Sequence, residues 1–180
     1  MNRLILITGD LASGKSTLAT SLSYALNIPC FIKDTIKEKY ADMYGFTTRE
    51  ENRALSVKAV NHMISAYEQF AKNGSDVILE ANFRSEELNR LKILSEKYTY
   101  EVVLFILRSD IEVLYQRFLA RLPNRHKAHT SMHLDENIDK FASYVNELRK
   151  EDPVFIPHII DTTKLSEKEV LDKALNILRK

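Results

Sequence analysis

Short apolar runs alternate along the whole chain with segments that have the pattern of amphipathic helices. Five runs are typical of strands buried on both faces, at residues 4–8, 29–33, 76–81, 100–107 and 154–160. Helices are expected over 15–26, from about 34, over about 47–71, over 85–97, from about 111, over about 134–148 and after 166. This alternation predicts an α/β fold with one parallel sheet between two layers of helices.

Two of the expected helices begin with the spacing of a capping box. Thr47 is followed three residues later by Glu50, and Ser166 by Glu169. In such a pair each side chain bonds the backbone N–H of the other residue, which satisfies donors that a helix start leaves unpaired. We therefore expect the long helix to start at Thr47 and the last helix at Ser166.

The composition is that of an ordinary globular protein. A length of 180 residues predicts one domain, spanning 1–180, that can bury a core without disulfides or metals. The 26 basic and 25 acidic residues are mixed along the chain, which argues against the basic stripe of a dedicated nucleic-acid binder. The single cysteine, Cys30, lies in an apolar run, so we expect a buried thiol in a reducing, cytoplasmic protein. No stretch approaches the ~20 apolar residues of a membrane span, and the sequence does not indicate an oligomeric state.

The stretch "GDLASGKST" matches the pattern G-x-x-x-x-G-K-[ST] and lies between the first strand and the first helix. In such a loop, backbone N–H groups and the positive helix N-terminus face phosphate oxygens. Lys15 would reach the outer phosphates, and the Ser16 hydroxyl would ligate Mg²⁺. The expected nucleotide-binding residues are Gly9, Asp10, Leu11, Ala12, Ser13, Gly14, Lys15, Ser16 and Thr17.

Polar residues follow each of the five expected strands, and the carboxyl ends of parallel strands share one edge, where ligands bind. At that edge Asp34 is either the general base for a hydroxyl acceptor or the N-cap of the helix that follows it. Glu80 either holds Mg²⁺ or orients the acceptor, or else it is a buried acid paired with a cation, and Asn82 can assist by hydrogen bonding. The residues expected along this edge are Gly9, Asp34, Glu80, Arg108, Asp110 and Asp161.

Three arginines repeat every four residues, at Arg117, Arg121 and Arg125. Like charges at this spacing on a helix destabilise it by a few tenths of a kcal/mol per pair, roughly, and a bound anion would offset that repulsion. We expect Arg121 and Arg125 to contact the transferring phosphate; the alternative is a solvated basic face. Three histidines follow in the loop 122–133, but no cysteine or carboxylate set joins them, so a zinc site is not favoured.

The segments "GDLASGKST", "FIKDTIKE", "VILEANF" and "RFLARLPNRHKAH" occur in the order seen in small P-loop kinases. The chain resembles the group that contains polynucleotide 5′-kinases, chloramphenicol phosphotransferase and zeta toxins. The resemblance covers nearly the whole chain. It implies a P-loop NTPase three-layer sandwich, with a five-stranded parallel sheet of order 2-3-1-4-5 and a mobile helical lid around 122–133.

By similarity, Asp34 matches the acceptor-activating aspartate of that group, and Arg121 and Arg125 match its lid arginines. The segment "DTT", which begins at Asp161, resembles the one that leads toward the adenine pocket. The chain departs from the group at Lys127 and Ala128, where the lid often has Pro-Gly, and at Asp10. Because backbone N–H groups form the phosphate cradle, we expect the Asp10 side chain to point outward, toward a lid arginine or the acceptor.

The sequence therefore predicts an ATP- and Mg²⁺-dependent phosphotransferase that moves the γ-phosphate of ATP to a hydroxyl of a small molecule or nucleotide. The expected catalytic residues are Lys15, Asp34, Arg121 and Arg125, and Ser16 and Glu80 would hold Mg²⁺. The acceptor pocket would come mainly from residues 35–60, with Tyr40, Tyr44 and Arg49 as candidates.

Two other functions fit the same residues. A polynucleotide 5′-hydroxyl kinase would bind nucleic acid, which the balanced charge does not favour. An ATP-binding, toxin-like or regulatory module would act with a protein partner. The missing N-K-x-D motif argues against a GTPase, and the four glycines argue against a shikimate kinase.

Overall fold

The computed structural model of the protein describes residues 2–129 and 133–179. One parallel sheet has the strand order β2-β3-β1-β4-β5, as the resemblance implied. The strands are β1 (Arg3–Gly9), β2 (Cys30–Ile32), β3 (Val77–Glu80), β4 (Glu101–Arg108) and β5 (Pro157–Asp161). The helices are α1 (Lys15–Leu26), α2 (Lys33–Tyr44), α3 (Arg49–Lys72), α4 (Ser85–Tyr98), α5 (Ile111–Arg121), α6 (Ile138–Leu148) and α7 (Glu167–Leu178), with a 3₁₀ turn at Leu122–Asn124.

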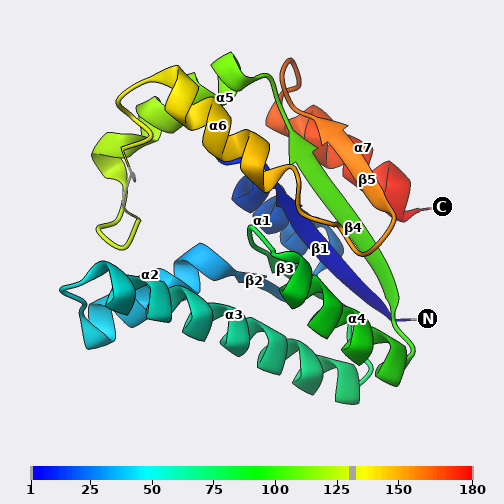
Figure 1. Ribbon diagram of the computed structural model, residues 1–180. Helices are drawn as coiled ribbons and strands as arrows, with labels where there is room; N and C mark the ends of the chain where they lie inside the picture. Colours follow the sequence, from blue (N-terminus) through cyan, green and yellow to red (C-terminus); the bar gives the residue numbers. More distant parts are fainter. Residues whose placement is uncertain (1, 130–132, 180) are drawn as a thin grey trace.

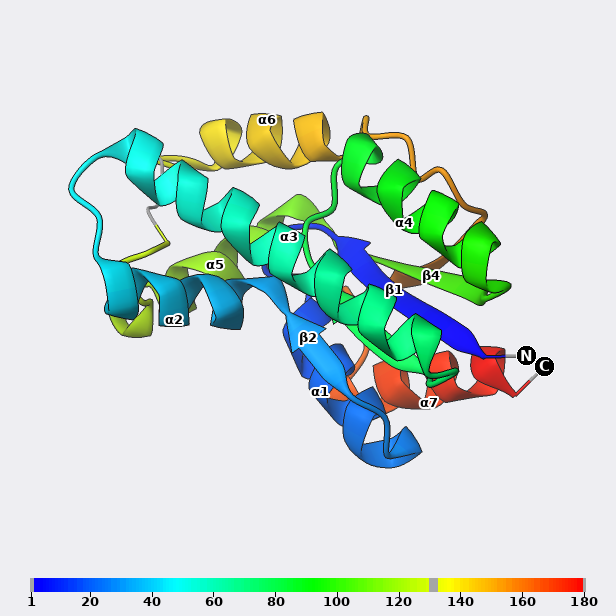
Figure 2. The same ribbon diagram turned by 90° about the horizontal axis from the view of Figure 1, so that it is seen from below.

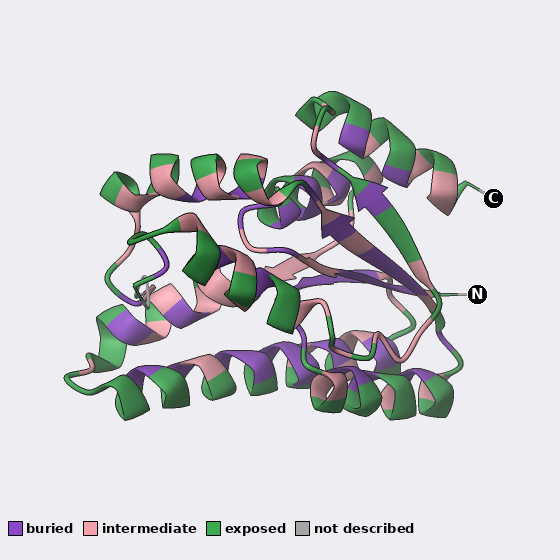
Figure 3. Ribbon diagram, turned by 45° about the horizontal axis from the view of Figure 1, so that its top comes forward, coloured by how far each residue is buried: buried purple, intermediate pink, exposed green. Residues whose placement is uncertain are grey.

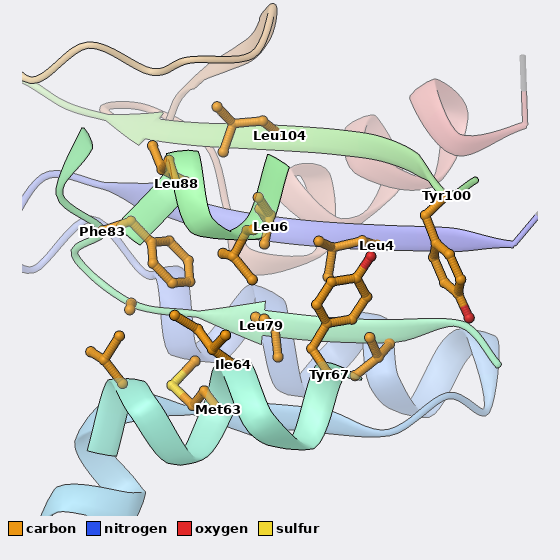
Figure 4. Packing of buried hydrophobic residues seen from close by; sticks show 14 of the residues in the cluster. Leu4, Leu6, Met63, Ile64, Tyr67, Leu79, Phe83, Leu88, Tyr100 and Leu104 are labelled. Carbon is orange, nitrogen blue, oxygen red and sulfur yellow. The ribbon is translucent and has the colours of Figure 1, made fainter. Parts of the chain in front are cut away.

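The sheet is covered on both faces, as its apolar strands require. Leu4 and Leu6 of β1 pack with α3 and α4, whereas Ile5 and Ile7 pack with α1 and α7. Figure 2 shows α4 and α7 on opposite sides of β1 and β4, and Figure 3 shows the buried residues gathered on the strands and on the helix faces toward them. The α3–α4 side is closed by apolar side chains and by the edge-on rings of Tyr67 and Tyr100, 5.6 Å apart (Figure 4).

A third apolar cluster lies beyond the carboxyl ends of the strands. It joins α5 and α6 through Phe118 and Phe141, and it includes Ala12 of the loop after β1. In Figure 1, α2 lies on one side of this end of the sheet and the α5–α6 pair lies on the other. The segment between α5 and α6 therefore starts and ends above the same edge of the sheet.

Three predicted boundaries were wrong. The long helix begins one residue later than expected, because the capping box joins Thr48 to Glu51 and not Thr47 to Glu50. The last strand begins at Pro157, since Val154 has a φ of 61° and lies in a turn. Proline is tolerated there because β5 is an edge strand. The helix expected from about 134 begins at Ile138, after the capping residue Asn137. The capping box at Ser166 is confirmed.

Cys30 is half-buried, and burial raises the pKa of its thiol to about 12, so the group is an uncharged part of β2. Of the helices in the described part of the chain, none combines the length and the apolar character that crossing a membrane requires.

Candidate functional site

The loop between β1 and α1 is shaped by glycines at its two ends. Gly9 has a φ of 126°, and a Cβ there would lie 2.1 Å from the carbonyl oxygen of Leu107. Gly14 is the N-cap of α1 in the left-handed region, with a φ of 92°. In the described structure the first turn of α1 has neither a side-chain cap nor an acidic residue. Its N–H groups therefore remain suited to an external anion.

Lys15 is buried beside this loop and donates to the backbone carbonyl of Asp10 at 2.5 Å. The same carbonyl accepts bonds from the N–H of Ser13 at 3.3 Å and from its hydroxyl at 2.8 Å. Burial lowers the pKa of the Lys15 ammonium, against the opposing effect of Glu80 and Asp34. The ammonium is thus held against the loop, and Lys15 lines the cavity onto which the loop opens.

The loop opens onto a cavity of about 490 Å³, called here the larger cavity. Its walls come from four places: the loop and α1, the start of α2, the end of β3, and the end of α5 with the segment after it. Among the lining residues are Lys15, Ser16, Asp34, Glu80, Arg121 and Arg125. The structure thus brings together, around one space, the residues that the sequence predicted for catalysis and for the metal.

Glu80 is buried at the end of β3 and accepts a hydrogen bond from the Ser16 hydroxyl at 3.0 Å. Burial raises the pKa of the Glu80 carboxyl, while Lys15 works in the opposite direction. Nearby, Asn82 lines the larger cavity, and its buried side-chain oxygen has no partner among the described residues. A hydroxyl and a carboxylate side by side are the hard oxygen donors that Mg²⁺ prefers, so these residues fit that ion.

Asp34 lies in the first turn of α2, whose N-cap is Ile32, so the capping role considered for Asp34 is wrong. One carboxylate oxygen lies 3.2 Å from the Lys33 ammonium, and the other lies 3.9 Å from Nδ1 of His129. Burial opposes ionisation of Asp34, but Lys33 and His129 more than offset it and hold its pKa below the usual value. Asp34 is therefore an ionised carboxylate facing the cavity at neutral pH.

The described part of residues 122–133, here the lid segment, contacts α2 beside the larger cavity through residues 126–129. The carbonyl of Ala128 accepts bonds from the ammonium of Lys37 at 2.8 Å and from the amide of Asn52 at 3.1 Å. The N–H of His129 donates to the carbonyl of His126 at 2.9 Å, so this turn forms without the Pro-Gly of the resembling group. Residues 130–132 of the segment lie outside the described residues.

The lid histidines do not converge on a common point. His126 pairs with Asp42 at 3.1 Å and His129 with Glu38 at 2.8 Å, and His133 pairs with Glu136 at 2.9 Å. Each ring therefore has its own carboxylate. His126 and His129 thus connect the lid segment to α2, whereas His133 pairs with a residue three positions further along the chain.

Of the three repeating arginines, Arg117 differs from the others. Its guanidinium donates to the hydroxyl of Thr162 at 3.1 Å and to the backbone carbonyl of Thr162 at 2.9 Å. Arg121 and Arg125 line the larger cavity, and burial lowers the pKa of both guanidinium groups. Arg121 and Arg125 thus line the larger cavity, whereas Arg117 is hydrogen-bonded to the segment after β5.

A second cavity of about 380 Å³ adjoins the loop on the side of α7. Asp161 lies outside it, exposed at the end of β5, where it accepts a bond from the N–H of Thr163 at 2.8 Å. Arg108 and Asp110 also lie outside both cavities, although they stand at the predicted edge of the sheet. The predicted segment "DTT" does reach the second cavity through Thr162, but the sequence analysis missed Leu165, Glu167 and Val170, which also line it.

The prediction for Asp10 was wrong. Its side chain is 1% exposed and points inward, where both oxygens bond the guanidinium of Arg149 at 3.0 and 2.6 Å. Arg149 is the C-cap of α6 and not one of the lid arginines. A buried carboxylate is favourable only when it is paired and hydrogen-bonded, and this contact meets both conditions.

A family model described as an AAA domain matches residues 5–152. The chain belongs to the AAA domain family. A comparison with curated protein sequences gives no match.

Many solved structures share the fold of this family member. A candidate kinase from Chloroflexus aurantiacus is 23% identical with a TM-score of 0.77, covering 99% of this chain and 96% of that one. Shikimate kinase from Aquifex aeolicus is 19% identical with a TM-score of 0.63 (98% and 96% covered). A tunicamycin resistance protein from Deinococcus radiodurans is 18% identical with a TM-score of 0.65 (99% and 96% covered). At these identities the likeness establishes a fold shared with P-loop kinases.

Proposed function

We propose that the protein is an ATP- and Mg²⁺-dependent phosphotransferase whose acceptor is a hydroxyl of a small molecule. The observation that carries this proposal is the set of residues that line the larger cavity. They include residues of the loop between β1 and α1 (here the phosphate-type loop) and an ionised Asp34, together with Arg121 and Arg125. A donor site without an acceptor base would suffice for nucleotide binding. Transfer of the phosphate to a hydroxyl needs, in addition, a carboxylate to take the proton and further cations to stabilise the transferring group.

In the proposed reaction, Asp34 accepts the proton of the acceptor hydroxyl as its oxygen bonds to the γ-phosphorus, and the bond from that phosphorus to ADP breaks. Lys15, Arg121 and Arg125 stabilise the negative charge on the transferring group. Ser16 and Glu80 would hold Mg²⁺, and the ion would supply positive charge against the negative charge of the outer phosphates. The second cavity, beside Arg117 and Thr162, would receive the nucleoside part of ATP.

The cavity walls favour a small hydroxylated acceptor over a nucleic acid. Among the described residues that line the larger cavity there is neither phenylalanine nor tyrosine, the usual platforms for an unpaired base. Tyr40 and Tyr44, which the sequence suggested for the acceptor, lie outside it, and the Lys58 ammonium covers both rings. Polar groups of Glu38 and His129 take their place beside Asp34.

The direct test combines ATP titration with a screen for acceptor-dependent ADP release over hydroxylated metabolites and 5′-hydroxyl oligonucleotides. No binding of ATP would refute the proposal. Phosphorylation of the oligonucleotides, weakened steeply by salt, would identify a polynucleotide kinase instead. ATP binding without any acceptor, together with a co-purifying protein, would identify the regulatory module.

We expect Lys15→Met to weaken ATP binding about ten- to a hundredfold, because a hydrogen bond to a charged group contributes about 1.5–3 kcal/mol. Calorimetric titration measures the change. Lys39→Met is the matched control, since Lys39 is exposed on α2 and lies outside the larger cavity. Equal affinities in all three proteins would exclude Lys15 from the donor site.

We expect Glu80→Gln to raise the Mg²⁺ concentration needed for half-maximal ATP turnover by about tenfold or more, the range typical of groups that support a metal. Glutamine keeps the shape and the bond to Ser16 but removes the negative charge. Asp161→Asn removes a carboxylate at the same edge of the sheet but outside the cavity, and should leave the Mg²⁺ requirement unchanged. The same shift in both variants would mean that the effect is general electrostatics.

A further inference from the structure

The buried contact between Asp10 and Arg149 joins three parts of the chain. Nε of Arg149 lies 3.0 Å from Oδ1 of Asp10, and Nη2 lies 2.6 Å from Oδ2. Oδ2 also accepts the N–H of Ser109 at 3.1 Å, and Nη2 donates to the carbonyl of Ser109 at 2.8 Å. The phosphate-type loop, the link from β4 to α5, and the end of α6 thus meet at one residue of the loop.

The backbone of Asp10 is held by hydrogen bonds, as its side chain is. Its N–H donates to the carbonyl of Leu107 at 2.9 Å, and its own carbonyl holds the ammonium of Lys15 and both donors of Ser13. The next residues, Leu11 and Ala12, pack in the apolar cluster of α5 and α6. Asp10 therefore connects Arg149 to Lys15 and Ser13 of the same loop.

Stability alone does not require a charged pair at this place. A buried ion pair is often no more stabilising than well-packed apolar residues of similar volume, because both charges lose their hydration. What an apolar pair would not reproduce is the fixed direction of a bidentate arginine–carboxylate contact. Here that contact sets the orientation of the residue whose carbonyl holds Lys15.

We propose that Arg149 is a positioning residue for the phosphate-binding loop. Acting through Asp10, it holds the loop in its receiving shape before the nucleotide arrives, and it fixes that loop to α6, the helix that follows the lid segment. The inference rests on the proposed binding of ATP at this loop. A loop that is already ordered loses less conformational entropy on binding, so preorganisation appears as affinity.

The test compares ATP affinity with thermal stability in the full-length protein. Arg149→Met leaves a buried charge unpaired and should lower both. The double variant Asp10→Leu/Arg149→Leu removes both charges, so we expect its melting temperature to recover most of the loss while its Kd for ATP stays about tenfold or more above that of the wild type. Amide exchange of residues 10–14 without nucleotide should be faster in the double variant.

Two further variants complete the design. Arg149→Lys keeps a cation but not the bidentate contact, and should fold and bind ATP with intermediate affinity. Lys150→Met removes the neighbouring, exposed charge at the end of α6, which pairs with Glu147, and should bind ATP like the wild type.

The outcomes separate the two proposals. Wild-type affinity in both the double variant and Arg149→Lys would make the pair purely structural and overturn the inference, while ATP binding itself would stand. If the double variant does not fold, Arg149→Lys decides alone: wild-type affinity overturns the inference and weaker binding supports it. Equal losses in Lys150→Met and Arg149→Met, which each remove one positive charge, would attribute the effect to net charge and also overturn it. A wild type that does not bind ATP refutes the proposed function together with this inference.

Discussion

Gly9→Ala is expected to unfold the protein or to leave it on the edge of unfolding. The new Cβ would lie 2.1 Å from the carbonyl oxygen and 2.6 Å from the nitrogen of Leu107, both backbone atoms of the neighbouring strand β4. Relief requires β1 and β4 to separate where Gly9 and Leu107 are paired, at the centre of the sheet. A φ of 126° adds strain that only glycine avoids. We expect a loss of about 4 kcal/mol or more, against a typical total of roughly 5–15 kcal/mol.

Gly14→Ala is the matched control, because it makes the same change at the other end of the loop. Gly14 also has a positive φ, 92°, but nothing lies within 4 Å of the position that a Cβ would take. The expected loss is only the conformational term, about 1–2 kcal/mol. Urea unfolding of both variants gives the two free energies. Similar losses would mean that the contact with Leu107 relaxes easily and that backbone strain alone explains both glycines.

The fold could be predicted because its signals are local or nearly so. Apolar runs buried on both faces require helices above and below the sheet, and parallel strands require crossovers between them. The start of the long helix was wrong because two neighbouring residues fit the same capping pattern. Both Thr47 and Thr48 are followed three residues later by a glutamate, so the spacing fits either residue, and in the structure Thr48 is the cap.

The residues of the site that could be predicted are those that lie at or just after the ends of strands. Lys15, Asp34 and Glu80 follow strands whose carboxyl ends share one edge, so their meeting is a property of the sheet. The partners Glu38 and His129, and likewise Asp10 and Arg149, are 91 and 139 residues apart. The spacing of residues along the chain does not indicate such contacts, because they depend on how α2 and α6 pack beyond the ends of the strands.

The same distinction explains the error at Asp10. In a site built for anions, an acidic side chain was expected to turn toward solvent or a lid arginine. Burial is instead favourable because the guanidinium of Arg149 donates hydrogen bonds to both oxygens of Asp10. The loop sequence contains the acid but not its partner, and only the partner determines whether the side chain points in or out.

Asp34→Asn is expected to lower acceptor-dependent turnover by about 10²- to 10⁴-fold, the usual contribution of a positioned general base. Asparagine keeps the shape of the side chain but cannot take the proton of the hydroxyl. The loss should fall on kcat, while the Kd for ATP changes little, because Lys15 and the loop, and not Asp34, would hold the phosphates. Steady-state kinetics with an acceptor from the screen, beside ATP titration, separates the two quantities.

The control for this prediction is Asp42→Asn, two turns further along α2. Asp42 carries the same charge and contacts the lid segment through His126, but it lies outside the larger cavity. A general effect of helix charge or of lid attachment would lower turnover in both variants, whereas a base acts only from the position of Asp34. Undiminished turnover in Asp34→Asn would remove the carboxylate from the chemistry. Because His129 lies 3.9 Å from Asp34 and its other ring nitrogen is held by Glu38 at 2.8 Å, that histidine would then be the remaining group placed to take the proton.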